Sequence, residues 1–140
     1  MTDQNITLRI IVENPPVRFK VQRGKDELLE AISATAKQLV FEFSVRVRDD
    51  RPDGTPNFLG PFAQGPAGGR FVYVNSGTMT GESGSPWTRR AKVPLGGITW
   101  SLIRKAAGSV IEGRIEGTAC DGGPACATVP LLGGGWRIAQ

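Results

Sequence analysis

The stretch VFEFSVRVR at residues 40–48 decides the fold class, because apolar and polar residues alternate along it without interruption. This period of two predicts a β-strand with one face in the core and the other in water. The inward row consists of Phe41, Phe43, Val45 and Val47. The outward row consists of Glu42, Ser44, Arg46 and Arg48. The Asp-Gly pair at Asp53 and Gly54 is typical of a tight turn after such a strand.

Similar alternation predicts further strands on both sides of this one. In TLRIIVEN, residues 7–14, the inward row is Leu8, Ile10 and Val12. Pro15 and Pro16 end this strand, because neither can donate a hydrogen bond to a neighbouring strand. The other predicted strands cover residues 17–22, 70–75 and 110–117, with one or two more within 127–132 and 135–139.

The strand predicted at residues 110–117 carries both acidic and basic residues. Its inward row consists of Ile111 and Ile115. Glu112 and Glu116 lie four residues apart, which is about 13 Å along a strand and too far for two carboxylates to act on one bond. Because Arg114 lies between them, we expect a charge ladder on the protein surface.

Two segments have the period of a helix. ITWSLIRKAAG, residues 98–108, places its apolar residues at helical spacing, with Thr99 as the N-cap and Gly108 as the stop. DELLEAISATAKQL, residues 26–39, has a similar apolar stripe behind Asp26. Its β-branched residues and the β-prone run that follows favour a loop instead, so a helix and a loop both remain open for this segment.

These elements predict a mainly β (α+β) fold, formed by residues 1–140 as a single domain. Many short strands separated by Gly and Pro turns are typical of an antiparallel barrel or a two-sheet sandwich. The one or two helices would cover an end or an edge of it. A chain of 140 residues is long enough to bury a core of its own.

The absence of histidine is the most informative feature of the composition. It excludes Ser-His-Asp and Cys-His catalysis and every metal site that needs imidazole. Two cysteines alone cannot complete a four-thiolate zinc site. An enzyme would have to rely on carboxylates, a thiol, Lys, Arg or Tyr. The sequence therefore favours a protein without catalysis and predicts neither a metal nor a cofactor.

No apolar stretch approaches the length of about 20 residues that a membrane-spanning helix needs. The first residues, MTDQNITLRI, lack the basic and apolar regions of a signal peptide. We therefore expect no membrane association and a cytoplasmic location. In that compartment Cys120 and Cys126 would be reduced thiols.

Two Gly-rich stretches form the candidate ligand site. The first, residues 57–70, contains FLGPFAQGP, whose prolines exclude a central strand. They favour a hairpin shaped by Pro and Gly with buried aromatic residues, and a ligand-facing loop is the alternative. The second, residues 78–92, ends in WTRRAK. An aromatic residue beside arginines suits an anionic or planar ligand, although a solvated basic turn is the alternative. The predicted ligand-binding residues are Asn57, Gln64, Arg70, Trp87, Arg89 and Arg90.

We therefore expect a binding module for a small anionic or aromatic ligand, with charge from arginines and a stacking face from Trp87. One alternative is a single-stranded nucleic-acid-binding β-barrel. The net charge of +4 is modest, and Glu42 shares a strand face with Arg46 and Arg48, so nucleic acid is the less favoured partner. A further alternative is a structural protein that forms a homodimer through an exposed edge strand.

Several segments of the chain resemble one known family. They are FLGPFAQGP with RFVYVNSGT, SPWTRRAKVPLGGITW and DGGPACATVP, and the likeness extends from LRIIVENPP to GWRIA. On these segments the chain resembles a small bacterial family known as domain of unknown function 5990. The resemblance implies a compact, stand-alone cytoplasmic protein. It implies no activity, cofactor or catalytic residue.

Overall fold

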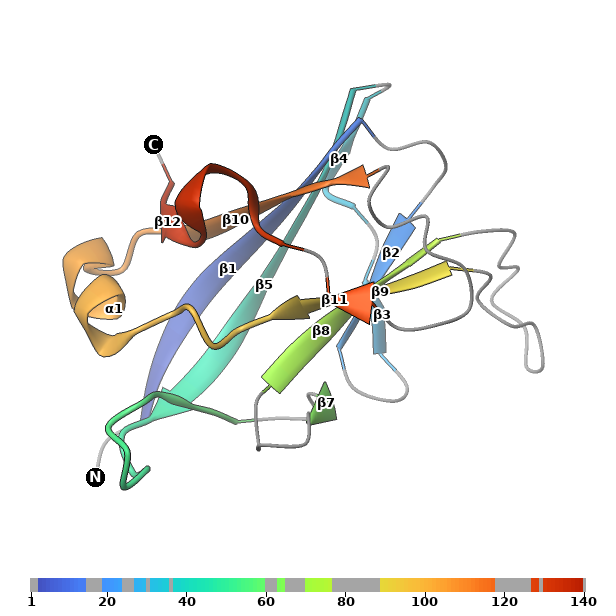
Figure 1. Cartoon of the computed structure of the whole chain (residues 1–140). Coiled ribbons are helices and arrows are strands. Elements are labelled where there is room, and N and C mark those ends of the chain that lie inside the picture. Colours follow the sequence, from blue (N-terminus) through green and yellow to red (C-terminus); the bar gives the residue numbers. More distant parts are fainter. Residues whose placement is uncertain are drawn as a thin grey trace.

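The computed structural model shows a mainly β fold (Figure 1). The residues that it describes are 3–14, 19–23, 27–29, 31–35, 37–59, 63–64, 70–76, 89–117, 127–128 and 130–139. Within these residues the strands form two sheets, and there is one α-helix, α1 (Trp100–Ala106). A short 3₁₀ turn, Leu132–Gly134, precedes the last strand.

The first sheet contains the longest strands. In spatial order they are β12 (Arg137–Ile138), β10 (Ile111–Glu116), β1 (Asp3–Glu13), β5 (Gln38–Arg48) and β4 (Ser33–Ala34). β6 (Asn57–Leu59) also pairs with β5, at the end away from β4. β1 and β5 are antiparallel along their whole length, from Asp3 opposite Arg48 to Glu13 opposite Gln38. β10 runs parallel to β1, so the sheet is mixed rather than purely antiparallel.

The second sheet contains shorter strands. In spatial order they are β11 (Ala127–Thr128), β9 (Arg89–Pro94), β8 (Arg70–Ser76), β2 (Phe19–Arg23) and β3 (Glu27–Leu29). β7 (Ala63–Gln64) also pairs with β8. Neither sheet closes on itself within the part of the chain that the structure describes. The barrel that the sequence offered as one alternative is therefore not formed by these strands.

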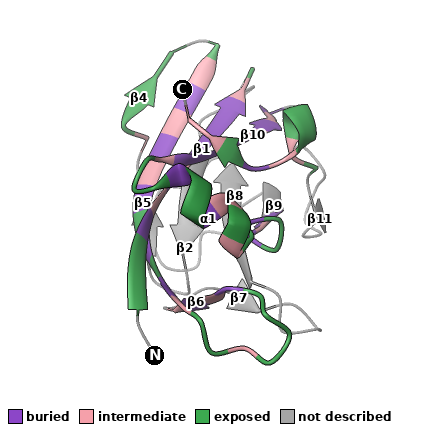
Figure 2. Ribbon diagram, turned by 90° about the vertical axis from the view of Figure 1, so that its left-hand side faces the viewer, coloured by how far each residue is buried: buried purple, intermediate pink, exposed green. Residues whose placement is uncertain are grey.

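The inward rows predicted for the long strands are confirmed. The buried residues of these rows are Leu8, Ile10, Val12, Phe41, Phe43, Val45, Val47, Ile111 and Ile115. Figure 2 shows buried residues recurring along β1 and β5 between more exposed ones. Ile11, on the opposite face, is an exception, because it is only 4% exposed although it lies apart from this core. Its register partners are Val40 and Arg114, and long charged side chains commonly cover apolar surface with their stems.

The core joins the two sheets and the helix. Besides the inward rows of the first sheet, it contains Val72 and Val93 of the second sheet and Ile103 and Ala106 of α1. Figure 1 shows α1 beside one end of the first sheet, next to β12. Burial of these apolar side chains is the main source of the fold's stability.

Trp136 connects the two sheets. Its indole Nε1 donates a hydrogen bond of 3.0 Å to the carbonyl oxygen of Pro94 in β9. Its ring lies against Gly113 in β10, where an added Cβ would come within 2.8 Å of the ring atoms Cε3 and Cζ3. A glycine in a strand often marks such a close approach. Trp136 can therefore reach the second sheet only because residue 113 has no side chain.

The helix predicted at residues 98–108 is confirmed in a shorter form. The Thr99 hydroxyl accepts a hydrogen bond from the backbone N–H of Leu102, as an N-cap should. Ala107 adopts the left-handed conformation at the C-cap, with φ 49°, and Gly108 follows with φ 91°. The left-handed stop thus begins one residue before the predicted glycine.

The segment at residues 26–39 is not a helix, and its described residues form β3, β4 and the start of β5. The Thr35 hydroxyl accepts hydrogen bonds from the backbone N–H groups of Lys37 and Gln38. The backbone N–H of Thr35 donates to the carbonyl oxygen of Gln38, which closes a hairpin between β4 and β5. Threonine hydroxyls compete with helical hydrogen bonds in this way, and the hairpin satisfies the backbone instead.

Candidate functional site

The face of the first sheet away from the core carries alternating charges. Arg9 in β1 lies directly opposite Glu112 in β10 and Glu42 in β5. Its Nε donates to Glu42 Oε2 at 3.0 Å, and its Nη1 donates to Glu112 Oε1 at 3.5 Å. Cross-strand pairs of opposite charge stabilise neighbouring strands. The register of the three strands therefore places one arginine between two carboxylates.

Glu112 is the most buried charged residue of this face, with its side chain 8% exposed. Its Oε2 accepts a hydrogen bond of 3.1 Å from Nε of Arg114, so each carboxylate oxygen faces a guanidinium. Charge-assisted hydrogen bonds of this kind offset the cost of removing a carboxylate from water. The charge ladder predicted around Arg114 is present, but Glu112 is covered rather than wet.

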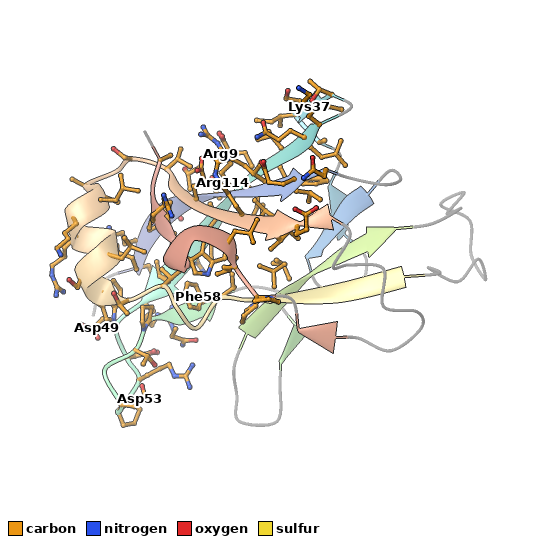
Figure 3. All side chains as sticks on the ribbon, turned by 45° about the horizontal axis from the view of Figure 1, so that its top comes forward. Arg9, Lys37, Asp49, Asp53, Phe58 and Arg114 are labelled. Carbon is orange, nitrogen blue, oxygen red and sulfur yellow. The ribbon has the colours of Figure 1, made fainter. Side chains whose placement is uncertain are left out.

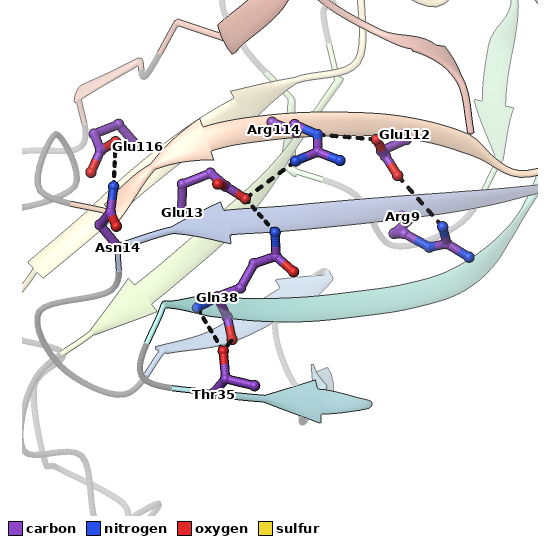
Figure 4. Close-up of polar contacts among 8 residues, drawn as sticks. All are labelled: Arg9, Glu13, Asn14, Thr35, Gln38, Glu112, Arg114 and Glu116. Carbon is purple, nitrogen blue, oxygen red and sulfur yellow. Dashed lines mark hydrogen bonds and ion pairs between the residues drawn. The ribbon is translucent and has the colours of Figure 1, made fainter. Parts of the chain in front are cut away.

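Arg114 extends the network toward the end of β1 (Figure 4). Its Nη1 lies 3.4 Å from Glu13 Oε1, and the same oxygen accepts a hydrogen bond of 2.7 Å from Nε2 of Gln38. Nearby, Nδ2 of Asn14 donates to Glu116 Oε2 at 3.3 Å. These polar side chains link β10, β1 and β5 across the sheet face, and the network as a whole stabilises the sheet.

Asp3 balances the charges at the other end of β5. Arg48, its register partner, donates to both carboxylate oxygens at 2.7 and 3.2 Å. Nε of Arg46 lies 3.4 Å from Oδ2 of the same carboxylate. The hydrogen bond from Arg48 lowers the pKa of Asp3 below its ordinary value. Both arginines are therefore already paired within the sheet.

Every arginine of β1, β5 and β10 thus contacts a carboxylate. Figure 3 shows the sheet face around Arg9 and Arg114, and the turn with Asp49 and Asp53 at the far end of the molecule. Among the described residues, no group of three or more acidic or cysteine residues is placed to hold a metal ion. This face therefore has the features of a structural charge network.

α1, the helix in the described part of the chain, is too short to cross a membrane.

The second sheet has a different charge. Its central strands, β2, β8 and β9, read FKVQR, RFVYVNS and RRAKVP and contain no acidic residue. Their basic residues are Lys20, Arg23, Arg70, Arg89, Arg90 and Lys92. The acidic residues of the three long strands in the first sheet are Asp3, Glu13, Glu42, Glu112 and Glu116. β3 adds one acidic residue, Glu27, which lies opposite Arg23. Positive charge is therefore concentrated in the central strands of the second sheet.

The register of β2, β8 and β9 places three of these basic residues on one face. Val72 in β8 and Val93 in β9 are opposite each other and buried, so they mark the core side of the sheet. Successive residues of a strand alternate between the two faces. One row on the face away from the core is Lys20, Asn75 and Arg90. The next row on that face is Gln22, Tyr73 and Lys92.

The residues that the sequence predicted for ligand binding lie on different parts of the fold. Asn57 is in β6 of the first sheet, where its Nδ2 donates to Asp50 Oδ1 at 3.0 Å. Gln64 and Arg70 lie opposite each other in the β7–β8 pair. Trp87 lies outside the described residues. The structure thus brings Gln64 and Arg70 together and places Asn57 in the other sheet.

Arg89 and Arg90 pair with Ser76 and Asn75 at the end of β8. Arg70 begins β8, so its backbone lies about 20 Å along the strand from Ser76. The register does not bring the backbone of Arg70 close to the other two predicted arginines. Because Arg89 and Arg90 are adjacent in β9, they also lie on opposite faces of the sheet.

Sequence reasoning did not select Lys20, Tyr73 and Lys92 as binding residues. Their alternation with apolar residues is visible in the sequence, but alternation does not reveal which strands are neighbours. The register that aligns Tyr73 with Lys92 and Gln22 supplies that information.

Comparison with protein families identifies the domain. A family model described as Family of unknown function (DUF5990) matches residues 6–139. The chain belongs to this family. The resemblance noted from the sequence is therefore confirmed, and the DUF5990 match spans α1 and most of both sheets. No curated protein and no solved structure matches the chain.

Proposed function

We propose that this DUF5990 protein is a binding module for an anionic ligand, which it holds on its second sheet. The observation that carries the proposal is the separation of charge between the sheets. β2, β8 and β9 contain six basic residues and no acidic residue, whereas the arginines of β1, β5 and β10 contact carboxylates. Anions are attracted to surfaces on which one sign of charge is concentrated.

Ion pairing makes the first sheet the weaker candidate for a ligand surface. An anion that approached Arg48 or Arg46 would compete with Asp3, which lies 2.7 Å from Arg48. An anion that approached Arg9 would compete with Glu42 at 3.0 Å. Among the described strands of the second sheet the one acidic residue is Glu27 of β3, which lies opposite Arg23. An anion at the other basic residues of β2, β8 and β9 would meet no competing carboxylate from these strands.

The residues selected from the sequence support a ligand that is anionic and in part planar. Arg89 and Arg90 begin β9 opposite two polar residues, and Trp87 precedes Arg89 by two positions. Guanidinium groups bind carboxylate or phosphate through two parallel hydrogen bonds, and aromatic rings stack on planar groups. Arg70 and Gln64 would serve the same ligand class at the other end of β8.

Thermal unfolding with tripolyphosphate tests this proposal. At a concentration ten times the Kd, binding to the folded state adds about 1.4 kcal/mol, which raises the Tm of a domain of this size by about 3–6 °C. The double variant Arg89→Ala, Arg90→Ala should lose at least half of this shift. Tripolyphosphate should be used at low millimolar concentration and at constant sodium chloride. Under these conditions the rise in Tm that salts cause through their exclusion from the protein surface stays small.

The matched control is Arg104→Ala, Lys105→Ala, which removes two exposed positive charges from α1. This control should keep the full shift, because α1 is not part of the second sheet. An equal shift in all three proteins, or no shift in the wild type, would contradict the proposal.

A further inference from the structure

We infer that the face of the second sheet away from Val72 and Val93 binds single-stranded nucleic acid. The inference rests on the proposed function and names its ligand class. Figure 1 shows β2, β8 and β9 side by side, apart from the long strands β1 and β5. The relevant positions on the three strands are Lys20, Gln22, Phe71, Tyr73, Asn75, Arg90 and Lys92.

The positive charges on this face are spread over an extended area. Lys20 and Arg90 occupy the two ends of one row that crosses β2, β8 and β9, which places their backbones about 10 Å apart. Lys92 lies in the neighbouring row, about 7 Å along β9 from Arg90. A chain of phosphates fits charges that are spaced in this way better than a single compact anion does.

Two aromatic residues lie on β8, the strand between the basic residues of β2 and β9. Tyr73 lies at the centre of its row, between Gln22 and Lys92, and Phe71 is two residues earlier on the same face of β8. Aromatic residues on a sheet provide platforms on which unpaired bases stack, while basic residues follow the phosphate backbone. Bases in a duplex are already stacked on each other, so this combination favours a single strand.

The charge separation removes the main objection to a nucleic-acid ligand. The objection from the sequence was the modest net charge and the presence of Glu42 beside Arg46 and Arg48. All three of those residues belong to β5 of the first sheet. The face of the second sheet that binds the ligand is the one away from Val72 and Val93. In the part of β2, β8 and β9 that the structure describes, this face contains no acidic residue that would repel a phosphate.

Fluorescence anisotropy with labelled oligo-dT and oligo-U tests the inference. Each oligonucleotide should be about 12 nucleotides long, a length within the range that one β domain covers. The full chain should bind at least one of the two and should bind a hairpin duplex more weakly. With three phosphate contacts, the slope of log K against log salt should be about −2, since each contact on a single strand contributes about −0.7.

Two matched pairs of variants locate the binding face. Arg90→Ala should make the salt slope shallower by about 0.7, whereas Arg104→Ala, in α1 and outside the second sheet, should leave it unchanged. Tyr73→Ala should weaken binding about 5- to 100-fold with no change in slope, and Tyr73→Phe should retain the affinity because it keeps the ring. Circular dichroism spectra should confirm that each variant is folded.

The outcomes separate this inference from the proposed function. If tripolyphosphate raises the Tm but neither oligonucleotide binds, the inference is wrong and the anion site stands. If neither ligand has an effect, both are wrong. Equal binding to the duplex, or equal effects of Arg104→Ala and Arg90→Ala, would also overturn the inference.

Discussion

Arg9 on β1 lies directly opposite Glu112 on β10, and their side chains form an ion pair of 3.5 Å although the residues are 103 positions apart in the chain. Because β1 and β10 are parallel, this contact joins the first strand to the strand that follows α1. Arg114 holds the second oxygen of the same carboxylate at 3.1 Å. Glu112 is therefore the residue on which the charge network of the first sheet depends most.

We expect Glu112→Gln to lower the free energy of unfolding by about 2 kcal/mol, because two guanidinium groups lose their charged partner. The effect should stay below that of a fully buried pair, since the side chains of Arg9 and Arg114 are 28% and 41% exposed. Urea unfolding measures the difference. Glu42→Gln is the control, with a loss under about 1 kcal/mol, because its ion pair is more exposed. Equal losses in the two variants would contradict the conclusion that the charge network depends most on Glu112.

A second prediction concerns the pH dependence of the Asp3–Arg48 pair. The hydrogen bond from Arg48 lowers the pKa of Asp3 in the folded protein. A lowered pKa means that the stabilisation is present above the pKa of the unfolded chain and is lost as the pH falls through the folded value. In Arg48→Ala we expect the Asp3 pKa to rise toward its ordinary value, which an NMR titration of the carboxyl carbon can follow.

Asp53 provides an internal control for this titration. Its pKa is lowered by hydrogen bonds from the hydroxyl and the backbone N–H of Thr55, and not by Arg48. Its titration should therefore be the same in the wild type and in Arg48→Ala. If the Asp3 pKa stays low in the variant, the hydrogen bond from Arg48 is not the main cause of the shift.

The inward row of β5 gives a third prediction. Phe43 is buried in the core, so Phe43→Ala should cost about 3–5 kcal/mol of unfolding free energy through lost burial and a cavity. Arg46→Ala, on the other face of the same strand, should cost no more than about 0.5 kcal/mol, because its side chain is 59% exposed and Asp3 keeps Arg48 as a partner. A loss below about 1 kcal/mol for Phe43→Ala would show that the strand faces the other way.

The contact between Trp136 and Gly113 gives a fourth prediction. An added Cβ at Gly113 would meet the Trp136 ring at 2.8 Å, so Gly113→Ala should destabilise the protein by about 1–3 kcal/mol. It should also move the NMR signal of the indole N–H that donates to Pro94. Gly96→Ala is the control, since nothing lies within 4 Å of its added Cβ. Similar stabilities for the two variants would mean that the ring does not depend on this glycine.

Much of the first sheet could be predicted because its signal is local. The alternation in β1 and β5 identifies the buried rows from a few neighbouring residues, and these rows are confirmed. The burial of Ile11 and Glu112 could not be predicted, since it depends on the parallel pairing of β1 with a distant strand. The sequence left a helix and a loop open for residues 26–39, and the strands found there depend on the hydrogen bonds of the Thr35 hairpin.

The candidate site was harder to predict than the fold. The sequence indicated that arginines near the start of β9 could bind an anion, but it grouped Arg70 with Arg89 and Arg90 although the register places them at opposite ends of β8. The row of Lys20, Asn75 and Arg90 combines residues from three strands, and the two ends of the row are 70 positions apart in the sequence. Only the pairing register shows that they share a face.

The most direct test of the charge separation is an NMR titration of the ¹⁵N-labelled protein with tripolyphosphate, which reports on each backbone amide separately. We predict the largest shifts at Lys20, Asn75 and Arg90 and at the neighbouring row of Tyr73 and Lys92. The amides of β1, β5 and β10 should shift little, because carboxylates already hold the arginines of those strands. Shifts that are largest in β1, β5 and β10, or no shifts at any concentration, would contradict an anion site on the second sheet.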